Sequence, residues 1–390
     1  MAAITSSSST NLNAQSGTQD HFWLRDKRWD LLFITLSVIV VPLPYLVYMF
    51  GRDVLGINDD LSRNIVNGFV AIAIGGPHMM STFLRTGLDD TFKKQYPMLI
   101  RSSIIIPIIV ISLAFLNLEL LLTVFFFWAS LHVLHQVMYI VELYNHKEYT
   151  FVRKDRQLDP LSRAIDYAVV LTCLFPIAAL KISQGNFDIG TNNLTRVIPG
   201  VFQQTWFFVV MSGIFGIAVT IYLIKTYFEL RQNRINWPKT IFIGFTVVVA
   251  FTIPALPNLD TAFQGLNTWH SFQYLALTFY IIKIRQVYGN LKTDAPLVAR
   301  VSEQAHDSRW LYAISALMLI GSGGVFLIVY MLAGIVRPDM DLHQHFDTAY
   351  YTSILAFLWI HYYHDHFLFT DFETLDDAFQ PNVYEGAIGD

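Results

Sequence analysis

Long runs of apolar residues recur along this sequence and limit the folds open to it. From Trp29 to Phe369, runs of 18 or more residues carry almost no charge. A helix of that length, rising about 1.5 Å per residue, crosses the roughly 30 Å hydrocarbon core of a bilayer. We therefore expect an all-α, polytopic integral membrane protein with about ten transmembrane helices in one bundle. The expected spans are residues 29–50, 64–84, 100–116, 119–142, 165–181, 205–226, 239–257, 262–282, 310–335 and 347–368.

Basic residues indicate how the bundle is oriented. Lys and Arg collect in the short cytoplasmic loops of membrane proteins. With the N-terminus inside, the inner segments hold 21 of the 26 basic residues. This asymmetry predicts both termini in the cytoplasm. Because the segments between spans are short, we expect one transmembrane domain, 29–369. The polar, low-complexity start predicts a disordered tail, 1–28, and the acidic end predicts a solvated tail, 370–390.

Composition narrows the possible partners and cofactors. The single cysteine, Cys173, excludes an intrachain disulfide and a thiolate metal cluster, so any metal must be bound through nitrogen and oxygen. The net charge of −4 and the lack of a basic cluster beyond the inner loops give no reason to expect a nucleic-acid partner. The expected partners are the lipid bilayer and an apolar small molecule, while the oligomeric state is left open.

Histidines are unusually frequent inside the expected spans. Seven of the twelve fall there, all in the second, fourth, eighth and tenth spans. In the orientation above these four helices run in the same direction, so residues at similar fractions of each span lie at similar depth. We expect them to present imidazoles to one layer of the bundle. The candidate metal ligands are His78, His132, His135, His270, His361 and His364, whereas His366 is expected near the membrane interface.

The spacing of these histidines repeats. "HVLHQ" (132–136) and "HYYHD" (361–365) are both H-x-x-H followed by a polar acceptor, and "HSFQ" (270–273) is H-x-x-Q. Side chains at i, i+3 and i+4 share one helical face. Gln136, Gln273 and Asp365 are therefore expected to orient the imidazoles by accepting their second N–H, and Asp365 is a further candidate ligand. An aspartate at the centre of a membrane helix costs about 2.5–3.5 kcal/mol, which a bound cation would offset.

The chemistry of such a site is constrained by its ligands and its place. A lone intramembrane histidine is usually a packed, hydrogen-bonded residue, so the inference depends on the convergence of several. Imidazole-rich sites suit iron, copper or zinc. A site in the apolar layer favours a substrate that arrives through lipid, and iron with open coordination positions can activate oxygen for its oxidation. We therefore expect a non-haem iron oxygenase, with haem or copper as alternative cofactors.

Three other functions use the same residue types. A di-iron desaturase or hydroxylase also needs many histidines, although its H-x3-H and H-x-x-H-H boxes do not occur here. A haem-binding electron carrier needs axial histidines on facing helices, which "HVLHQ" and "HYYHD" could supply. A metal or proton transporter could line its path with buried histidines.

The order of the motifs resembles one family. "GGPH" (75–78), "SLHVLHQ" (130–136), "WHSFQY" (269–274) and "HYYHDHFLF" (361–369) are similar to motifs of the membrane-bound Brp/Blh-type carotenoid 15,15'-dioxygenases. The resemblance implies a multi-helix protein that holds one non-haem iron through histidines and cleaves the central double bond of β-carotene with O₂, giving retinal. His78, His132 and His270 match the family's ligand positions. The chain departs from the pattern at Tyr274, where the family has a second histidine, and it has about two additional spans.

Overall fold

The computed structural model describes residues 22–153, 155–189, 192–287, 290–303 and 308–369, and these residues are almost entirely helical. The elements of the first half are α2 (Lys27–Trp29), η2 (Asp30–Thr35), η3 (Leu36–Val40), α3 (Leu43–Met49), η4 (Phe50–Val54), α4 (Asp59–Val70), η5 (Ala71–Gly75), α5 (Gly76–Arg85), α6 (Asp90–Gln95), α7 (Pro97–Ser102), α8 (Ile105–Leu116), α9 (Leu118–Lys147), η6 (Glu148–Val152), α10 (Pro160–Thr172) and α11 (Phe175–Ser183).

The second half begins with a minimal antiparallel pair of strands, in which Asp188 is opposite Asn193. Its elements are β1 (Asp188–Ile189), β2 (Asn192–Asn193), η7 (Leu194–Arg196), η8 (Gly200–Gln203), α12 (Thr205–Arg231), α13 (Trp237–Thr252), η9 (Ile253–Ala255), α14 (Leu259–Val287), α15 (Leu291–Asp294), α16 (Pro296–Glu303), α17 (Arg309–Met318), α18 (Ile320–Val336) and α19 (Leu342–Leu368). The prediction of an all-α fold is confirmed.

Helices run through all ten of the expected spans, but they differ in apolarity. Within the described residues, seven helical stretches are long and apolar enough to cross a membrane. The other three expected spans, 64–84, 262–282 and 347–368, correspond to α4–α5, α14 and α19 and do not meet that measure. These three carry histidines together with other polar residues, such as Asn67, Asn267 and Asp347.

Short polar residues begin the helices that build the bundle. Asn117 accepts the backbone N–H of Leu120 at the start of α9, and Asn236 does the same for Lys239 at the start of α13. Asp341 begins α19 with a reciprocal capping box, in which the Gln344 side chain accepts the Asp341 N–H. These contacts satisfy N–H groups that lack a partner in the first turn.

The helix that carries His78 is interrupted one turn before it. The π-helical segment η5 leads directly into α5, and Pro77 lies at the start of α5. Proline has no N–H for the carbonyl four residues earlier, and the Tyr312 hydroxyl donates to that carbonyl, on Ala73, at 2.6 Å. A Cβ on Gly76 would lie 2.6 Å from Leu319 Cδ1, so glycine allows the close packing of this helix against the α17–α18 junction.

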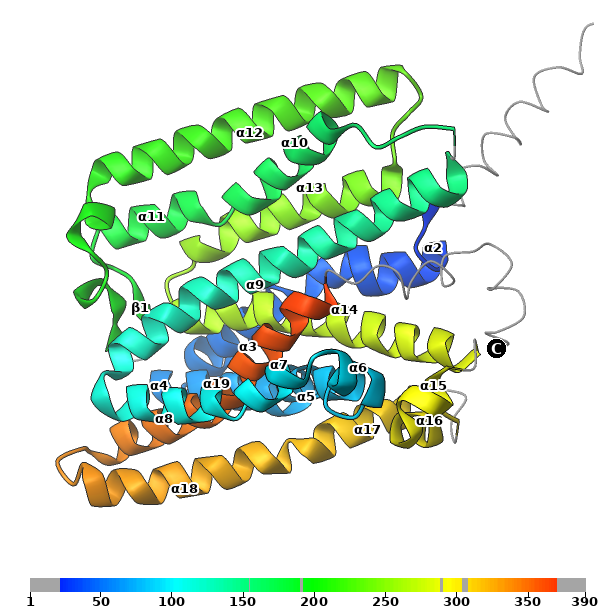
Figure 1. The fold of residues 1–390 in the computed structure, drawn as a ribbon. Coiled ribbons are helices and arrows are strands. Elements are labelled where there is room, and N and C mark those ends of the chain that lie inside the picture. Colours follow the sequence, from blue (N-terminus) through cyan, green and yellow to red (C-terminus); the bar gives the residue numbers. More distant parts are fainter. Residues whose placement is uncertain (1–21, 154, 190–191, 288–289, 304–307, 370–390) are drawn as a thin grey trace, which may run out of the picture.

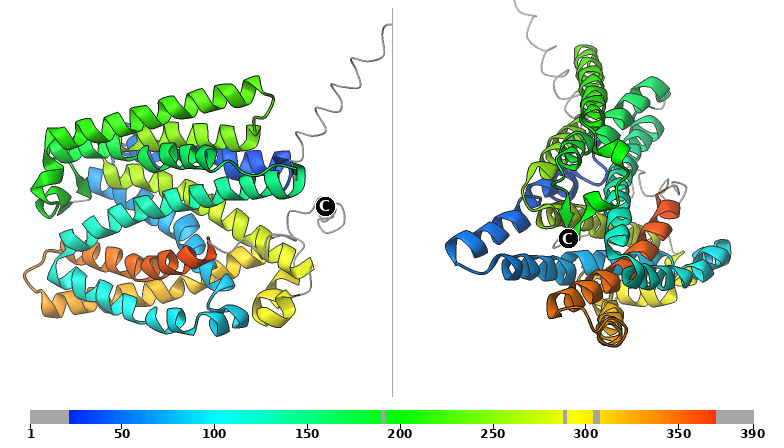
Figure 2. Two further views of the ribbon diagram at one scale, coloured as in Figure 1. Left: turned by 45° about the horizontal axis from the view of Figure 1, so that its top comes forward. Right: turned by 90° about the vertical axis from the view of Figure 1, so that its left-hand side faces the viewer.

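The helices stack in layers with the histidine-bearing helices inside. Figure 1 shows α12 along one edge and α18 along the opposite edge, with α9, α14 and α19 between them. Figure 2 shows the same order after rotation. Helix α5 contacts both α14 and α19, and α9 contacts α14 and α19 as well. This arrangement brings the four helices with candidate ligands together in the interior.

The chain ends are described only in part. Residues 1–21 and 370–390, which include most of the expected tails, lie outside the described residues. The expected N-terminal tail ran to residue 28, whereas Phe22, Trp23 and Leu24 are buried. The Lys147 ammonium donates to the carbonyls of Trp23 and Leu24, which fixes this segment against the end of α9. The cytoplasmic location of both termini stays a prediction.

Candidate metal centre

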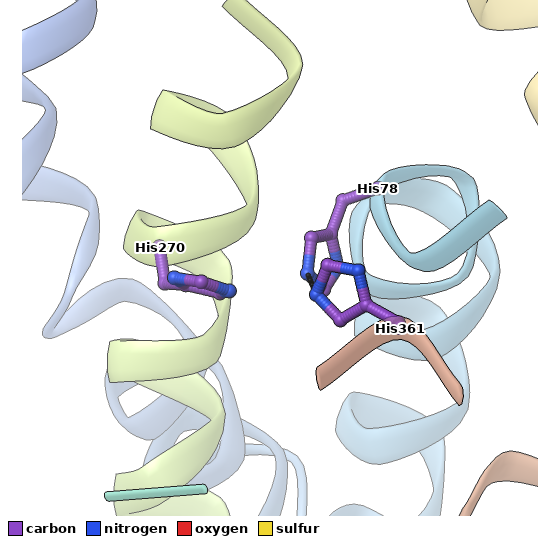
Figure 3. Close-up of side chains that lie close together, drawn as sticks. All are labelled: His78, His270 and His361. Carbon is purple, nitrogen blue, oxygen red and sulfur yellow. Dashed lines mark hydrogen bonds between the residues drawn. The ribbon is translucent and has the colours of Figure 1, made fainter. Parts of the chain in front are cut away.

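Four histidines and one aspartate from four helices converge at one point in the bundle. His78 comes from α5, His132 from α9, His270 from α14, and His361 and Asp365 from α19. Each is at most 4% exposed. Two groups of three side chains have ligand atoms within 4.8 Å of one another, His78 with His270 and His361, and His132 with His361 and Asp365. Figure 3 shows the first group, with rings from three helices turned toward one another.

The His78 ring is held by the interruption in its own helix. Its Nδ1 lies 2.7 Å from the carbonyl oxygen of Gly75, and a carbonyl can only accept. The proton of neutral His78 is therefore assigned to Nδ1, which leaves a lone pair on Nε2. That Nε2 lies 2.9 Å from Nε2 of His361.

The tautomer of His361 follows from the hydroxyl groups around it. Tyr274 donates to Asp365 Oδ1 at 2.7 Å, and Thr82 donates to the same oxygen at 3.1 Å. The Thr82 hydroxyl also lies 2.8 Å from the Tyr274 hydroxyl, and with its one proton assigned to Asp365 it accepts the hydrogen bond from His361 Nδ1. His361 Nε2 therefore also carries a lone pair. Two buried lone pairs that face each other at 2.9 Å repel one another unless a cation lies beside both.

Further atoms that could coordinate a metal lie around the same point and have no hydrogen-bond partner among the described residues. They are Nε2 of His132, both ring nitrogens of His270 and Oδ2 of Asp365. The Asp365 oxygen lies 3.4 Å from His361 Nε2 and 3.7 Å from His132 Nε2. Buried polar atoms are nearly always hydrogen-bonded, so several unpaired ones in one place call for an explanation.

A metal ion fits this set of donors. Metal–imidazole bonds of about 2.0–2.1 Å place two adjacent nitrogens on one ion about 3 Å apart. The Nε2 atoms of His78 and His361 have that separation, 2.9 Å. Neutral imidazoles and a carboxylate suit iron, copper or zinc, and a cation would balance the charge of Asp365, whose side chain is 0% exposed.

The structure places two expected ligands outside this cluster. His364 Nε2 contacts the Ser103 hydroxyl at 2.7 Å, and its Nδ1 contacts the Thr86 hydroxyl at 3.0 Å. His135 is half-buried, and its ring packs 5.7 Å from the ring of the exposed His366. In both H-x-x-H motifs only the first histidine joins the cluster, because the second is rotated toward the edge of the shared face.

The expected roles of the two glutamines also need correction. Gln136 donates to the backbone carbonyl of His270 at 3.1 Å and to Gln273 Oε1 at 3.3 Å. Gln273 in turn donates to the Ile34 carbonyl at 2.6 Å. Neither amide accepts an imidazole N–H in these contacts, and together they tie α9, α14 and η2 to one another beside the site. Asp365, by contrast, points at the histidines as expected.

The sequence interpretation missed three residues that orient the cluster. Thr82 and Tyr274 fix the His361–Asp365 pair as described, and the Ser271 hydroxyl lies 2.9 Å from His78 Nδ1. Thr82 and Tyr274 stand four residues after His78 and His270, respectively, so each lies on the ligand face of its helix. Applying the i, i+4 rule to hydroxyl-bearing residues as well as to histidines would have found both.

Comparison with known proteins adds no family assignment, since no family model, curated protein or solved structure matches the chain.

Proposed function

We propose that this chain is an integral membrane oxygenase of ten spans, with one non-haem iron bound by His78, His132, His270, His361 and Asp365. The observation that carries this proposal is the set of buried donor atoms without partners around the 2.9 Å pair of His78 and His361. When bound at this site, an iron ion with an open coordination position would activate O₂. The proposed substrate is an apolar molecule from the lipid phase.

The residues of the chain have separate tasks in this proposal. The Gly75 carbonyl and the Thr82 hydroxyl hold the Nδ1 protons, so that His78 and His361 present neutral lone pairs. Tyr274 and Thr82 bind one oxygen of Asp365 and leave the other directed at the ligands. Burial of the whole cluster excludes bulk water, which protects a reactive centre from side reactions.

The spacing of the donors favours a single ion over haem. Histidines on opposite faces of a haem iron hold their nitrogens about 4 Å apart, with the porphyrin ring between them. The Nε2 atoms of His78 and His361 are 2.9 Å apart, which leaves no space for that ring. The same spacing suits adjacent positions on one ion.

An apolar cavity lies next to the cluster. Its volume is about 550 Å³, within the range of about 300–1,000 Å³ typical of small-molecule sites. Gly75, whose carbonyl holds His78, and Tyr362, whose ring stacks on His132 at a centroid distance of 4.0 Å, both line it. A substrate in this cavity would lie one side chain away from the proposed ligands.

The family resemblance extends the proposal to carotenoids, with cleavage of the central double bond of β-carotene as the reaction. Expression in a carotenoid-producing host tests this extension. Loss of pigment with wild-type protein, but not with a His270→Ala variant, is expected. Unchanged pigment in cells that contain iron-loaded protein would point to another lipid substrate.

Metal content of the purified protein tests the site itself. Elemental analysis of detergent-purified wild-type chain is expected to find about one iron per chain. His132→Ala and His270→Ala should each lower the content at least tenfold, since they remove ring nitrogens that have no hydrogen-bond partner in the part of the chain that the structure describes. His135→Ala is the matched control, three residues from His132 on the same helix, and should keep its metal. Normal occupancy in both test variants would contradict the proposal.

A further inference from the structure

The apolar cavity lies on one side of the histidine cluster. Along α4, η5 and α5 its lining runs from Asn64 to Met79, and along α19 it runs from Phe346 to Tyr362, each about 22–24 Å at 1.5 Å per residue. Met79 and Tyr362 each follow a proposed ligand by one residue. On α9 and α14, every lining residue comes before the ligand of that helix. Met79 and Tyr362 therefore mark the end of the cavity that meets the cluster.

The opposite side of the cluster is filled by Phe369, which is 4% exposed. Its ring stacks on His132 at a centroid distance of 5.9 Å and on Tyr139 at 4.9 Å. It also lies 6.2 Å from the ring of Tyr274. In the described part of the chain, this packing leaves the cavity side as the route by which an apolar molecule approaches the cluster.

The cavity opens on the side of the bundle. Ile72 on η5 and Ile320 on α18 both line the cavity, and they are 68% and 69% exposed. Gly323, one turn along α18, also lines it and is exposed, and a Cβ built there meets nothing within 4 Å. In a bilayer this opening would face the lipid chains, which suits an apolar occupant.

Tyr362 forms the boundary between the cavity and the cluster. It lines the cavity, and its ring stacks on the ring of His132 at a centroid distance of 4.0 Å and an interplanar angle of 27°. Among the described residues, no other aromatic side chain of the lining has a ring contact with a proposed ligand. An apolar molecule in the cavity therefore meets the Tyr362 ring before it meets His132.

The Tyr362 ring is held on His132 by packing and not by its hydroxyl group. Tyr362 is 6% exposed, and among the described residues its hydroxyl has no hydrogen-bond partner. Buried tyrosine hydroxyls usually find one. The next residue, Tyr363, does so, with its hydroxyl 3.1 Å from that of Ser102. Without such a bond the Tyr362 ring can turn from His132 into the cavity, which offers space for it.

We propose that Tyr362 is the residue that determines which part of an apolar substrate reaches the metal. The molecule enters from the lipid through the opening at Ile72 and Ile320 and extends along the cavity to Tyr362. The ring limits how far the molecule advances, and it admits the molecule to the cluster when it turns from His132. The inference rests on the proposed function, because it concerns the substrate of the same site.

Photocross-linking of the full-length chain in lipid nanodiscs tests this proposal. The probe is hexadecane with a diazirine at carbon 2, and mass spectrometry locates the labelled residues. In the wild-type chain Tyr362 should be labelled, and His132 at least tenfold less than Tyr362. Tyr362→Ala should raise the labelling of His132 at least tenfold. Absence of label on Tyr362 in the wild type, or unchanged labelling of His132 in the variant, would overturn the proposal.

Substitutions at the same place separate the effect of the ring from other effects. Tyr362→Phe keeps the ring and should keep the wild-type pattern of labelling. Tyr363→Ala removes a ring of the same size one residue along α19, outside the lining, and should leave the labelling of His132 unchanged. If Tyr362→Ala fails to fold, Tyr362→Leu provides the same test, because it removes the ring and keeps an apolar side chain. An increase at His132 in Tyr363→Ala as large as in Tyr362→Ala would contradict the role of Tyr362.

A pair of glycine variants tests whether the probe reaches Tyr362 through this cavity. Gly323→Leu places a side chain at the opening and should lower the labelling of Tyr362 at least tenfold. Gly324→Leu, one residue along the same helix and outside the lining, should leave it unchanged. Equal labelling in both variants would overturn the proposed route. All cross-linking is done on chelator-treated protein, so a chain without iron would not alter its result, and failed cross-linking would not alter the metal content.

Discussion

Tyr274 illustrates how a single hydroxyl group controls the donor atoms of the cluster. The tyrosine donates to one oxygen of Asp365, which is completely buried, and so directs the other oxygen toward His132 and His361. The same position is where the resemblance to the carotenoid dioxygenases is lost, because that family has a histidine there. In this chain the residue acts on the carboxylate next to the proposed ion.

Replacing Tyr274 by phenylalanine should weaken metal binding without removing it. The ring keeps its volume, while Asp365 loses a hydrogen bond that fixes its orientation, and loss of such a partner typically lowers metal affinity about 10–100-fold. Competition with a chelator measures this change. Tyr363→Phe on α19 is the control, since its hydroxyl contacts Ser102 outside the cluster. Equal affinities for wild type and Tyr274→Phe would contradict the proposed orientation of Asp365.

For individual residues, the sequence predicted the histidines and the aspartate of the cluster. It also predicted His135 and His364 as ligands, which lie outside the cluster. The similar depths of the histidines on four helices predict His78, His132, His270 and His361, and the spacing of "HYYHD" adds Asp365. A spacing of three residues turns a side chain about 60° from its partner on a helix, and the packing of neighbouring helices decides whether it still reaches the site. The side chain of His135 does not reach the site, and no pattern within a single helix could have predicted this.

At the level of secondary-structure elements, the segment from η5 to α5 shows how an interruption of a helix positions a side chain of the proposed metal site, His78. Pro77 removes a backbone donor, a π-helical turn precedes it, and the Gly75 carbonyl becomes the partner of His78. Such turns occur often at functional sites. Two glycines and a proline in "GGPH" weaken the helix at this point, as the sequence alone indicates. The contacts with Tyr312 and Leu319 depend on α17 and α18, which are distant in sequence.

Substituting Gly76 by alanine should destabilise the bundle. A Cβ at this position would lie 2.5 Å from the Ala71 carbonyl oxygen and 2.6 Å from Leu319 Cδ1, and overpacking of this kind costs about 1–3 kcal/mol. Thermal unfolding in detergent, followed by tryptophan fluorescence, should show a lower Tm. Gly213→Ala on α12 serves as the control, because its Cβ meets nothing within 4 Å. An unchanged Tm for Gly76→Ala would show that the helices separate there at no cost.

For the whole molecule, the sequence predicted where the helices lie and that the histidines of several helices lie close together. Apolar runs located ten helical stretches, and the common direction of the even-numbered spans predicted that their histidines share a layer. Among the described residues, seven stretches are long and apolar enough to cross a membrane. The other three contain more polar residues, His270 and Asp365 among them, and Asp365 finds its hydrogen-bond partners Tyr274 and Thr82 only once the bundle has formed.

The number of spans predicts where the two ends of the chain lie. Ten crossings, if present, would together with the distribution of basic residues place both termini in the cytoplasm. Fusions of green fluorescent protein to either end should therefore fluoresce, and fusions of alkaline phosphatase should be inactive. Activity of the phosphatase at one end only would indicate an odd number of crossings, such as the seven most apolar helices alone.

The central claim is that one metal ion lies between His78 and His361. Anomalous X-ray diffraction at the absorption edge of the bound metal, from crystals of the protein purified without chelator, tests it most directly. The account predicts one peak within bonding distance of both Nε2 atoms, with His132, His270 or Asp365 completing the coordination. A peak elsewhere in the chain, or none in crystals whose elemental analysis shows metal, would contradict it.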